Sequence, residues 1–240
     1  MYQVNFLSHQ KLSLAMLPSL SIARPSARVV HVSSSMHLGG SLAPTSTARE
    51  AGWESPYSAD ARNLEQGNRV SMSDGFQQRY ADVKLMQVLY SKELNARLAA
   101  KARAGNNDLF DEDEEGEGEE GEGKSGRKQT VFSNSIHPGF VLTDLDRDMG
   151  LAGSFIKIFR RFAARPARDG AVTQVTVATA PELEGVGGRY FSDACMGDMC
   201  DPGLAMNAVV FNKEHAAAND ARLREWLWET AAEITGEDLE

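Results

Sequence analysis

Two short strand-like runs separated by a long helical segment constrain the fold of this chain more than any other feature. The first run covers residues 29–32 and the second covers residues 130–136. Between them, apolar residues recur at helical spacing from Tyr80 onward, with no proline or glycine before Gly105. Strands that alternate with long helices form parallel sheets covered by those helices. The sequence therefore predicts an α/β fold with a parallel sheet.

Tyr80 and Lys84 stand four residues apart at the start of this helical segment. Residues at that spacing are neighbours on one helix face, and an ammonium beside a phenol lowers a phenol pKa that is otherwise about 10. A tyrosine tuned in this way can exchange a proton near neutral pH. A surface tyrosine next to a surface lysine has the same spacing, so the pair alone does not specify a function. Tyr90 and Lys92 form a rival pair, but residues two apart on a helix do not face each other.

Further motifs stand in order around this pair. Residues 33–35 are serines that end the first strand, and the second strand leads into Pro138, Gly139 and Thr143. In this order the motifs resemble the short-chain dehydrogenase/reductase family, in which a strand ends in serines, a helix carries Tyr-x-x-x-Lys and a later strand leads into Pro-Gly-x-x-x-Thr. Within this family, the local sequence is most similar to the retinol dehydrogenase and WW-domain oxidoreductase branch. The similar stretches are residues 4–9, 32–37, 135–139 and 188–193.

This resemblance covers residues 4 to about 235 and implies a Rossmann-like oxidoreductase that transfers a hydride between a nicotinamide cofactor and a carbonyl or alcohol. The implied cofactor is NADP, with NAD as the alternative. Tyr80 would be the acid/base, Lys84 would lower its pKa and bind the cofactor ribose, and Ser34 would polarise the substrate oxygen. Asn5 matches the asparagine that in the family holds a water and kinks its helix, completing a proton relay to the lysine.

Ser34 is the serine that aligns with the catalytic serine of the family, two positions after Val32. The interval between Ser34 and Tyr80 is longer than is usual for the family, although the retinol dehydrogenase-like branch is expanded here. Ser33 and Ser35 therefore stay as alternatives to Ser34.

The Pro-Gly turn is expected at the carboxyl end of its strand, where open α/β sheets bind ligands. By resemblance, the turn of Pro138 and Gly139, with Val141, closes over the nicotinamide, and Thr143 bonds its carboxamide or the phosphates. A simple Pro-Gly turn in which Thr143 caps a helix would have the same local sequence.

The glycine-rich turn that places a pyrophosphate at a helix N-terminus does not occur in this sequence. By resemblance the chain begins at the helix that precedes the serine strand, so we expect a Rossmann-like fold that is incomplete on its N-terminal side, by roughly 90 residues. Two functions stay open on this basis. One is the catalytic part of a dehydrogenase/reductase, and the other is a truncated, non-catalytic relative that acts as a binding or scaffold protein.

The acidity of the chain comes from one segment. Residues 108–123 carry ten acidic and no basic residues, so the rest of a chain with a net charge of −9 is close to neutral. Such a Glu/Gly-rich stretch repels itself and buries no apolar area, so residues 106–128 are expected to form a disordered loop inserted into a single 240-residue domain. Either a tolerated insertion or a partner-binding loop would have this composition.

Other periodic segments complete the prediction. Helices are expected at residues 3–20, 166–180 and 216–234. By resemblance to the family, residues 187–191 form the last strand. By resemblance, the helix at 166–180 provides packing and homodimer contacts. Residues 151–164 form an amphipathic basic helix that suits either a lid over an apolar substrate or a contact with an anionic membrane surface.

Composition excludes several classes of protein. No apolar stretch is long enough for a membrane span or secretory signal, and two cysteines, Cys195 and Cys200, do not make a disulfide framework. We expect reduced thiols, no metal site, no nucleic-acid partner, and a location in the cytoplasm or on a membrane facing the cytosol. The expected partner is a small apolar carbonyl or alcohol substrate, resembling a retinoid, a steroid or a lipid aldehyde.

Overall fold

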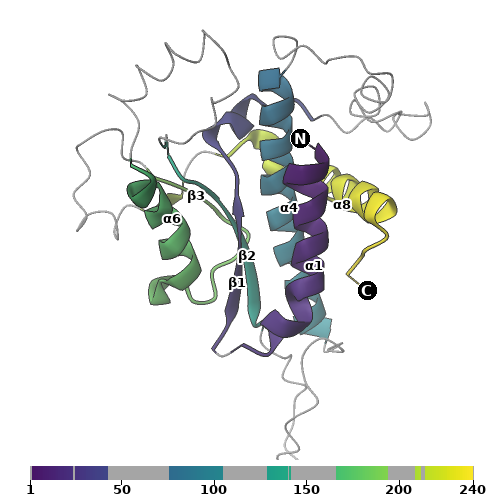
Figure 1. Ribbon diagram of the computed structural model, residues 1–240. Helices are drawn as coiled ribbons and strands as arrows, with labels where there is room; N and C mark the ends of the chain where they lie inside the picture. Colours follow the sequence, from purple (N-terminus) through teal and green to yellow (C-terminus); the bar gives the residue numbers. More distant parts are fainter. Residues whose placement is uncertain are drawn as a thin grey trace, which may run out of the picture.

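A parallel sheet between helices forms the centre of this protein. The structure, a computed structural model, describes residues 2–23, 25–42, 76–104, 129–139, 141, 166–193, 209–211 and 214–239. Helices α1 (Ser8–Ser21) and α4 (Phe76–Ala104) cover one face of the sheet, and α6 (Ala167–Thr179) covers the other (Figure 1). Helix α8 (Ala221–Thr235) packs on α4. The predicted α/β fold, a Rossmann-like parallel sheet with flanking helices, is confirmed.

The sheet of the described residues has four strands in the order β1 (Ala27–Val32), β2 (Val131–His137), β3 (Tyr190–Asp193) and β4 (Val209–Phe211). The first three strands are parallel, and β4 is antiparallel to β3. In the register of β1 and β2, Val32 lies opposite Ile136, so both strands end at the same edge of the sheet. The strands at residues 29–32 and 130–136 were predicted, whereas β4 was not.

Helix α4 is the central element of the core. Its leucines Leu85, Leu89, Leu94 and Leu98 are fully buried. They belong to one apolar cluster with side chains of α1, β1, β2 and α8. A helix enclosed by a sheet and by other helices is apolar around most of its circumference, and this packing explains why the middle of α4 is buried on most sides.

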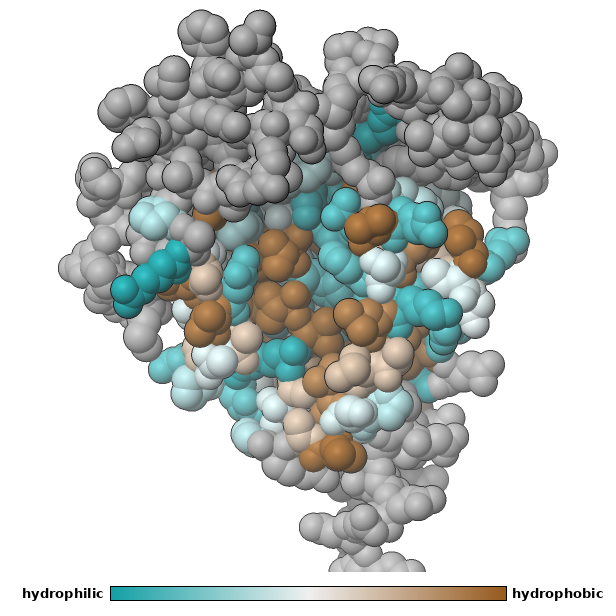
Figure 2. Space-filling model, viewed as in Figure 1, coloured by the Kyte–Doolittle hydropathy of each residue, from teal (hydrophilic) through white to brown (hydrophobic). Residues whose placement is uncertain are grey.

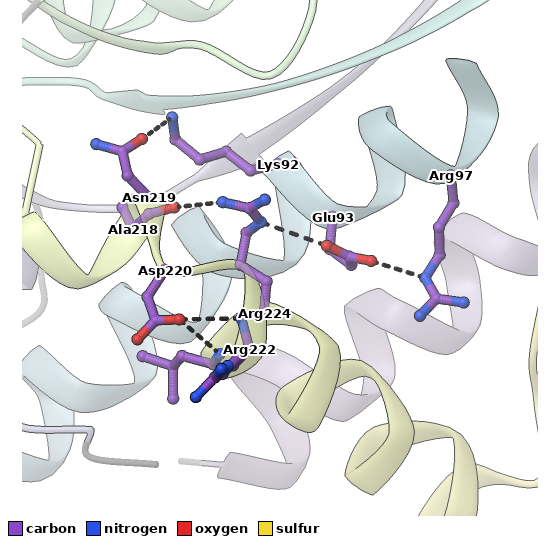
Figure 3. A network of polar contacts seen from close by, with 9 residues as sticks. Lys92, Glu93, Arg97, Ala218, Asn219, Asp220, Arg222 and Arg224 are labelled. Atoms are coloured by element: carbon purple, nitrogen blue, oxygen red, sulfur yellow. Dashed lines mark hydrogen bonds and ion pairs between the residues drawn. The ribbon is translucent and has the colours of Figure 1, made fainter. Parts of the chain in front are cut away.

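Polar contacts join α4 to the C-terminal helix around Glu93 (Figure 3). Its carboxylate accepts from Arg97 Nε at 3.0 Å and from Arg224 Nε at 3.3 Å. Asp220 caps α8 by accepting from the main-chain N–H of Arg222 and Leu223. Because this cap begins a new helix, the predicted helix at 216–234 is divided into a 3₁₀ turn, η5 (Ala216–Asn219), and α8.

Other helix boundaries also differ from the prediction. The predicted helix at 3–20 begins as a π-helical turn, η1 (Gln3–Leu7), before continuing as α1. Helix α4 begins at Phe76, one turn before Tyr80, which was predicted to open it. The predictions for the acidic segment 106–128, the basic helix 151–164, Thr143 and the two cysteines concern positions outside the described residues.

Apolar side chains gather on the face of the molecule between α6 and α1 (Figure 2). Among the described residues, exposed apolar side chains include Leu12 and Met16 on α1, Val172 and Val175 on α6, and Val32 at the end of β1. Within the part of the chain that the structure describes, no helix is both long and apolar enough to cross a bilayer.

Candidate functional site

The predicted site residues come from two strand ends and one helix. Ser34 lies just beyond β1, Pro138 and Gly139 lie just beyond β2, and Tyr80 and Lys84 lie on the first turns of α4. The two strands are parallel, and the N–H of Ser33 donates to the carbonyl of Ile136 at 2.7 Å. The strand ends are therefore held together at the edge of the sheet where α/β folds bind ligands.

Only one of the three serines presents its hydroxyl to Tyr80. Ser34 has an extended backbone and caps the 3₁₀ turn η2 (Ser35–Gly39), and its side chain hydrogen-bonds the Tyr80 hydroxyl. The hydroxyl of Ser33 instead donates to the Lys84 carbonyl at 2.7 Å, and Ser35 is exposed. Ser33 therefore fastens β1 to α4, whereas Ser34 is placed for chemistry.

Lys84 lies against the ring of Tyr80 rather than beside its oxygen. Its Nζ is 5.5 Å from the ring centroid, and it donates to the Val32 carbonyl at 2.8 Å and to Gln87 Oε1 at 3.0 Å. Two of the three N–H groups of the ammonium are used in this way. Among the described residues no acceptor is found for the third.

The pKa values at this pair differ from the sequence prediction. Burial raises the pKa of Tyr80, and its hydrogen bond with Ser34 opposes that change. Lys84 was expected to lower the pKa of Tyr80 by charge attraction, and this prediction is wrong for the structure described here. The reason is that Lys84 faces the ring and is held by the carbonyl of Val32, while removal of the phenol from water dominates.

Burial also lowers the pKa of Lys84, to about 8. A buried ammonium loses hydration that its hydrogen bonds replace only in part. At neutral pH the side chain is still mostly protonated, so it presents a positive charge to the site.

The pH dependence of folding provides a test of this buried charge. An unfolded lysine titrates at about 10.4, so between the folded pKa of about 8 and this value the unfolded chain binds more protons. The charge of Lys84 therefore destabilises the fold below pH about 8, and this penalty fades as the pH rises to about 10.4. We expect the unfolding free energy of the wild type, relative to Lys84→Met, to rise over this interval by about 3 kcal/mol. Denaturant titrations of both proteins at several pH values measure this difference in unfolding free energy. A difference that stays constant with pH would contradict the prediction.

Asn5 lies in the π-helical turn η1, as the kinked helix of the resembled family implied. Its main-chain oxygen accepts a hydrogen bond from Gln87 Nε2 at 2.6 Å. The other end of the same carboxamide contacts Lys84 Nζ. Asn5 and Lys84 are therefore linked through a side chain that the sequence analysis missed, although Gln87 follows Lys84 by three residues on the same helix face.

A second missed residue, His37, supports the main chain of Ser34. The imidazole is buried, with its Nδ1 2.7 Å from the Ser34 carbonyl. Its Nε2 accepts from the N–H of His215 at 3.3 Å, so Nδ1 carries the proton and donates to Ser34. Desolvation is the main cause that lowers the pKa of His37, which keeps the ring in this neutral form.

The turn after β2 is present as predicted. Gly139 has φ 82°, a left-handed conformation that favours glycine. Val141 lies close to α6, because a methyl group added at Gly170 would collide with its side chain. Pro138, Gly139 and Val141 thus lie at the strand edge that also holds Ser34, while Thr143 is not among the described residues.

The rival pair is not a site. Tyr90 is buried and stacks on Trp228 with 5.2 Å between ring centroids. Lys92 forms an ion pair with Glu214 at 2.7 Å. The exclusion of this pair by its spacing is therefore consistent with the structure.

Two further features of the described residues lie apart from this arrangement or are absent. A depression of about 700 Å³ between the ends of α1 and α8 contains none of the site residues. Within the same described ranges, no group of His, Cys, Asp and Glu side chains could hold a metal ion.

Known proteins are similar to this chain along nearly its whole length, although no family model matches it. Polyprenol dehydrogenase of Mus musculus is 28% identical, over 97% of this chain and 52% of that protein. WW domain-containing oxidoreductase of Gallus gallus is 29% identical over 99% of this chain and 44% of that protein. Retinol dehydrogenase 12 of Homo sapiens is 28% identical over 97% of this chain and 53% of that protein. The chain therefore spans about half the length of these relatives.

A solved structure supports the fold. The crystal structure of an uncharacterised protein from Mycobacterium paratuberculosis aligns with 98% of this chain and 58% of its own, with a TM-score of 0.51 and 20% identity. The sequence relatives are members of one family of oxidoreductases. The similarity to the short-chain dehydrogenase/reductase family, and to its retinol dehydrogenase and WW-domain oxidoreductase members, is thereby confirmed over nearly all of this chain.

Proposed function

We propose that this chain carries the proton-transfer part of an oxidoreductase site that converts between a carbonyl compound and an alcohol with a nicotinamide cofactor. The observation that carries this proposal is the hydrogen bond between the Ser34 and Tyr80 side chains, with Lys84 against the Tyr80 ring. These groups meet at the carboxyl edge of a parallel sheet, which is the usual ligand-binding edge of such folds.

The residues fit a nicotinamide dinucleotide in two respects. The Lys84 ammonium retains one N–H without an acceptor among the described residues, which suits a ribose hydroxyl, and Gly139 leaves the main chain open to a close approach. When bound, the dinucleotide would supply or accept the hydride. The side chains and main chain that would hold it belong to Tyr80, Lys84, Pro138, Gly139, Val141 and Thr143, and this set is compatible with NADP and with NAD.

The proton chemistry follows from Ser34 and Tyr80. Both hydroxyls can donate to one substrate oxygen, because the Ser34 side chain is a hydrogen-bond partner of Tyr80. The raised pKa of Tyr80 keeps its proton bound at neutral pH, so Tyr80 is suited to act as a general acid toward a carbonyl oxygen. As the carbonyl carbon receives a hydride, the oxygen takes the Tyr80 proton and becomes a hydroxyl. The side chain of Ser34, whose hydrogen bond lowers the pKa of Tyr80, would steady the phenolate that remains.

Apolar side chains around Ser34 favour an apolar substrate. Three apolar residues that flank Ser34 in the sequence each have more than a third of their surface exposed. They are Val32, Met36 and Leu38. Two of the relatives are named for retinol and polyprenol, which are both long apolar alcohols. We therefore propose a retinoid- or polyprenol-like alcohol, or the corresponding aldehyde, as the substrate class.

Cofactor binding and turnover test the proposal directly. The purified 240-residue protein would be titrated with NADPH and with NADH while cofactor fluorescence is followed, and then supplied with all-trans-retinal. We expect one dinucleotide to bind and to be consumed as retinal is reduced. Failure of both to bind, in protein shown to be folded by circular dichroism, would overturn the proposal and support a non-catalytic binding or scaffold role.

A further inference from the structure

Gln87 occupies a buried position between Lys84 and the N-terminal helix. Its side chain is 1% exposed, although glutamine is usually found at the surface. Its Oε1 accepts from Lys84 Nζ at 3.0 Å, and its Nε2 donates to the Asn5 carbonyl at 2.6 Å. Nε2 also lies 3.3 Å from His9 Nδ1.

These contacts allow one orientation of the carboxamide. An ammonium has only donors, so it must meet the amide oxygen, and a carbonyl has only acceptors, so it must meet the amide nitrogen. Reversal of the amide would break both hydrogen bonds and place like groups together. The Asn5 carbonyl therefore determines that the oxygen of Gln87 faces Lys84.

The partners of Gln87 come from an unusual piece of backbone. Asn5 lies in the π-helical turn η1, in which the N–H of Ser8 donates to the carbonyl of Gln3, five residues earlier. Such turns are rare and are frequent at functional sites. Here the turn presents the Asn5 carbonyl to α4, and Gln87 spans the distance from that carbonyl to Lys84.

Lys84 depends on this contact because a lysine side chain is long and rotates freely. Its ammonium has two acceptors among the described residues, the Val32 carbonyl and Gln87. Val32 belongs to β1 and Gln87 to α4, so the two contacts hold Nζ from the sheet and from the helix. If either hydrogen bond is lost, the remaining one does not fix the position of Nζ over the Tyr80 ring.

We infer that Gln87 is a positioning residue of this site, whose carboxamide joins the Asn5 main-chain oxygen directly to the Lys84 ammonium and holds that ammonium against Tyr80. This inference rests on the proposed function for its catalytic consequence. Its physical content, the control of Lys84 by Gln87, does not depend on turnover.

Two substitutions at Gln87 should move the pKa of Lys84 in opposite directions. Gln87→Leu removes an acceptor from a buried ammonium, so the pKa of Lys84 should fall, by about one unit. Gln87→Glu places a carboxylate next to the ammonium, so the pKa should rise by about one unit or more. NMR titration of the Lys84 Cε resonance in the full chain measures both values. A loss of packing alone would not shift the pKa of Lys84 in opposite directions in the two variants.

Gln10→Leu is the matched control. Gln10 is an equally buried glutamine on α1, its Nε2 donates to the Glu237 carbonyl, and it has no described contact with Lys84. Its replacement by Leu should leave the pKa of Lys84 unchanged. If the pKa of Lys84 is the same in the wild type, Gln87→Leu and Gln87→Glu, the inference is overturned.

Kinetics then separate this inference from the proposed function. If the wild type reduces retinal, Gln87→Leu should lower kcat about tenfold with little change in KM, because the Lys84 ammonium beside the Tyr80 ring is misplaced while the substrate surface remains. A wild type without turnover would contradict the proposed function and leave the NMR result standing. Normal kcat in Gln87→Leu together with an unshifted Lys84 pKa would reject the role of Gln87.

Discussion

Replacement of Tyr80 by Phe is expected to lower kcat/KM for carbonyl reduction by a factor of about 100 to 10,000, the usual contribution of a positioned acid or base. The substitution removes one oxygen atom and keeps the ring against which Lys84 Nζ lies. Ser34 loses its hydrogen-bond partner but keeps the N–H of Met36 at 3.2 Å. The fold should therefore remain, while the proton donor is lost.

Tyr90→Phe is the matched control for this experiment. Tyr90 is on the same helix, its hydroxyl lies 3.4 Å from the Gln10 carbonyl inside the core, and it faces no part of the site. Its loss should change the unfolding free energy slightly and leave kcat/KM within about twofold of wild type. Steady-state kinetics and circular dichroism on both variants make the comparison. Full activity in Tyr80→Phe would refute the assignment of Tyr80 as the acid.

Replacement of Trp228 by Ala should produce the largest loss of stability, about 3–5 kcal/mol of unfolding free energy. Trp228 is 2% exposed and stacks on Tyr90, with an interplanar angle of 9°. The Arg97 Cζ lies over the Trp228 ring, 4.6 Å from its centroid, and Trp228 Nε1 donates to Asp238 Oδ1 at 2.6 Å. Truncation would open a cavity where α8 meets α4 and would leave these partners without contacts.

The neighbouring Trp226 provides the comparison for Trp228. It lies on the same helix and is only partly buried at the margin of the same core cluster. Trp226→Ala should therefore cost clearly less than Trp228→Ala, about 1–2 kcal/mol. Urea denaturation followed by circular dichroism measures both. Equal losses would show that α8 is not held on α4 by the Trp228 indole. Because domains of this size are stabilised by only about 5–15 kcal/mol, the expected effect of Trp228→Ala is a large part of the total.

Much of the fold could be predicted because it depends on local patterns. The strand-like runs became β1 and β2, the unbroken apolar periodicity became α4, and the helix predicted at 166–180 became α6 (Ala167–Thr179). Strand β4 could not be predicted in this way. It is short and pairs antiparallel with β3 through contacts such as Phe191 with Phe211, which no local pattern reveals. The start of α8 at Asp220 was missed because the alanines before it also suit a helix.

The sequence by itself predicted that Tyr80 and Lys84 share a helix face and that the serines and the Pro-Gly turn follow two strands, because these features depend on local patterns. The choice of Ser34 among three serines came from the resemblance to the family. Tertiary structure alone decided how they meet. It directed Lys84 to the ring of Tyr80 instead of the oxygen, raised the pKa of Tyr80 through burial, and inserted Gln87 between Lys84 and Asn5. The reason is that desolvation and hydrogen-bond partners depend on groups from β1, α4 and η1 that are distant in the chain and adjacent only after folding.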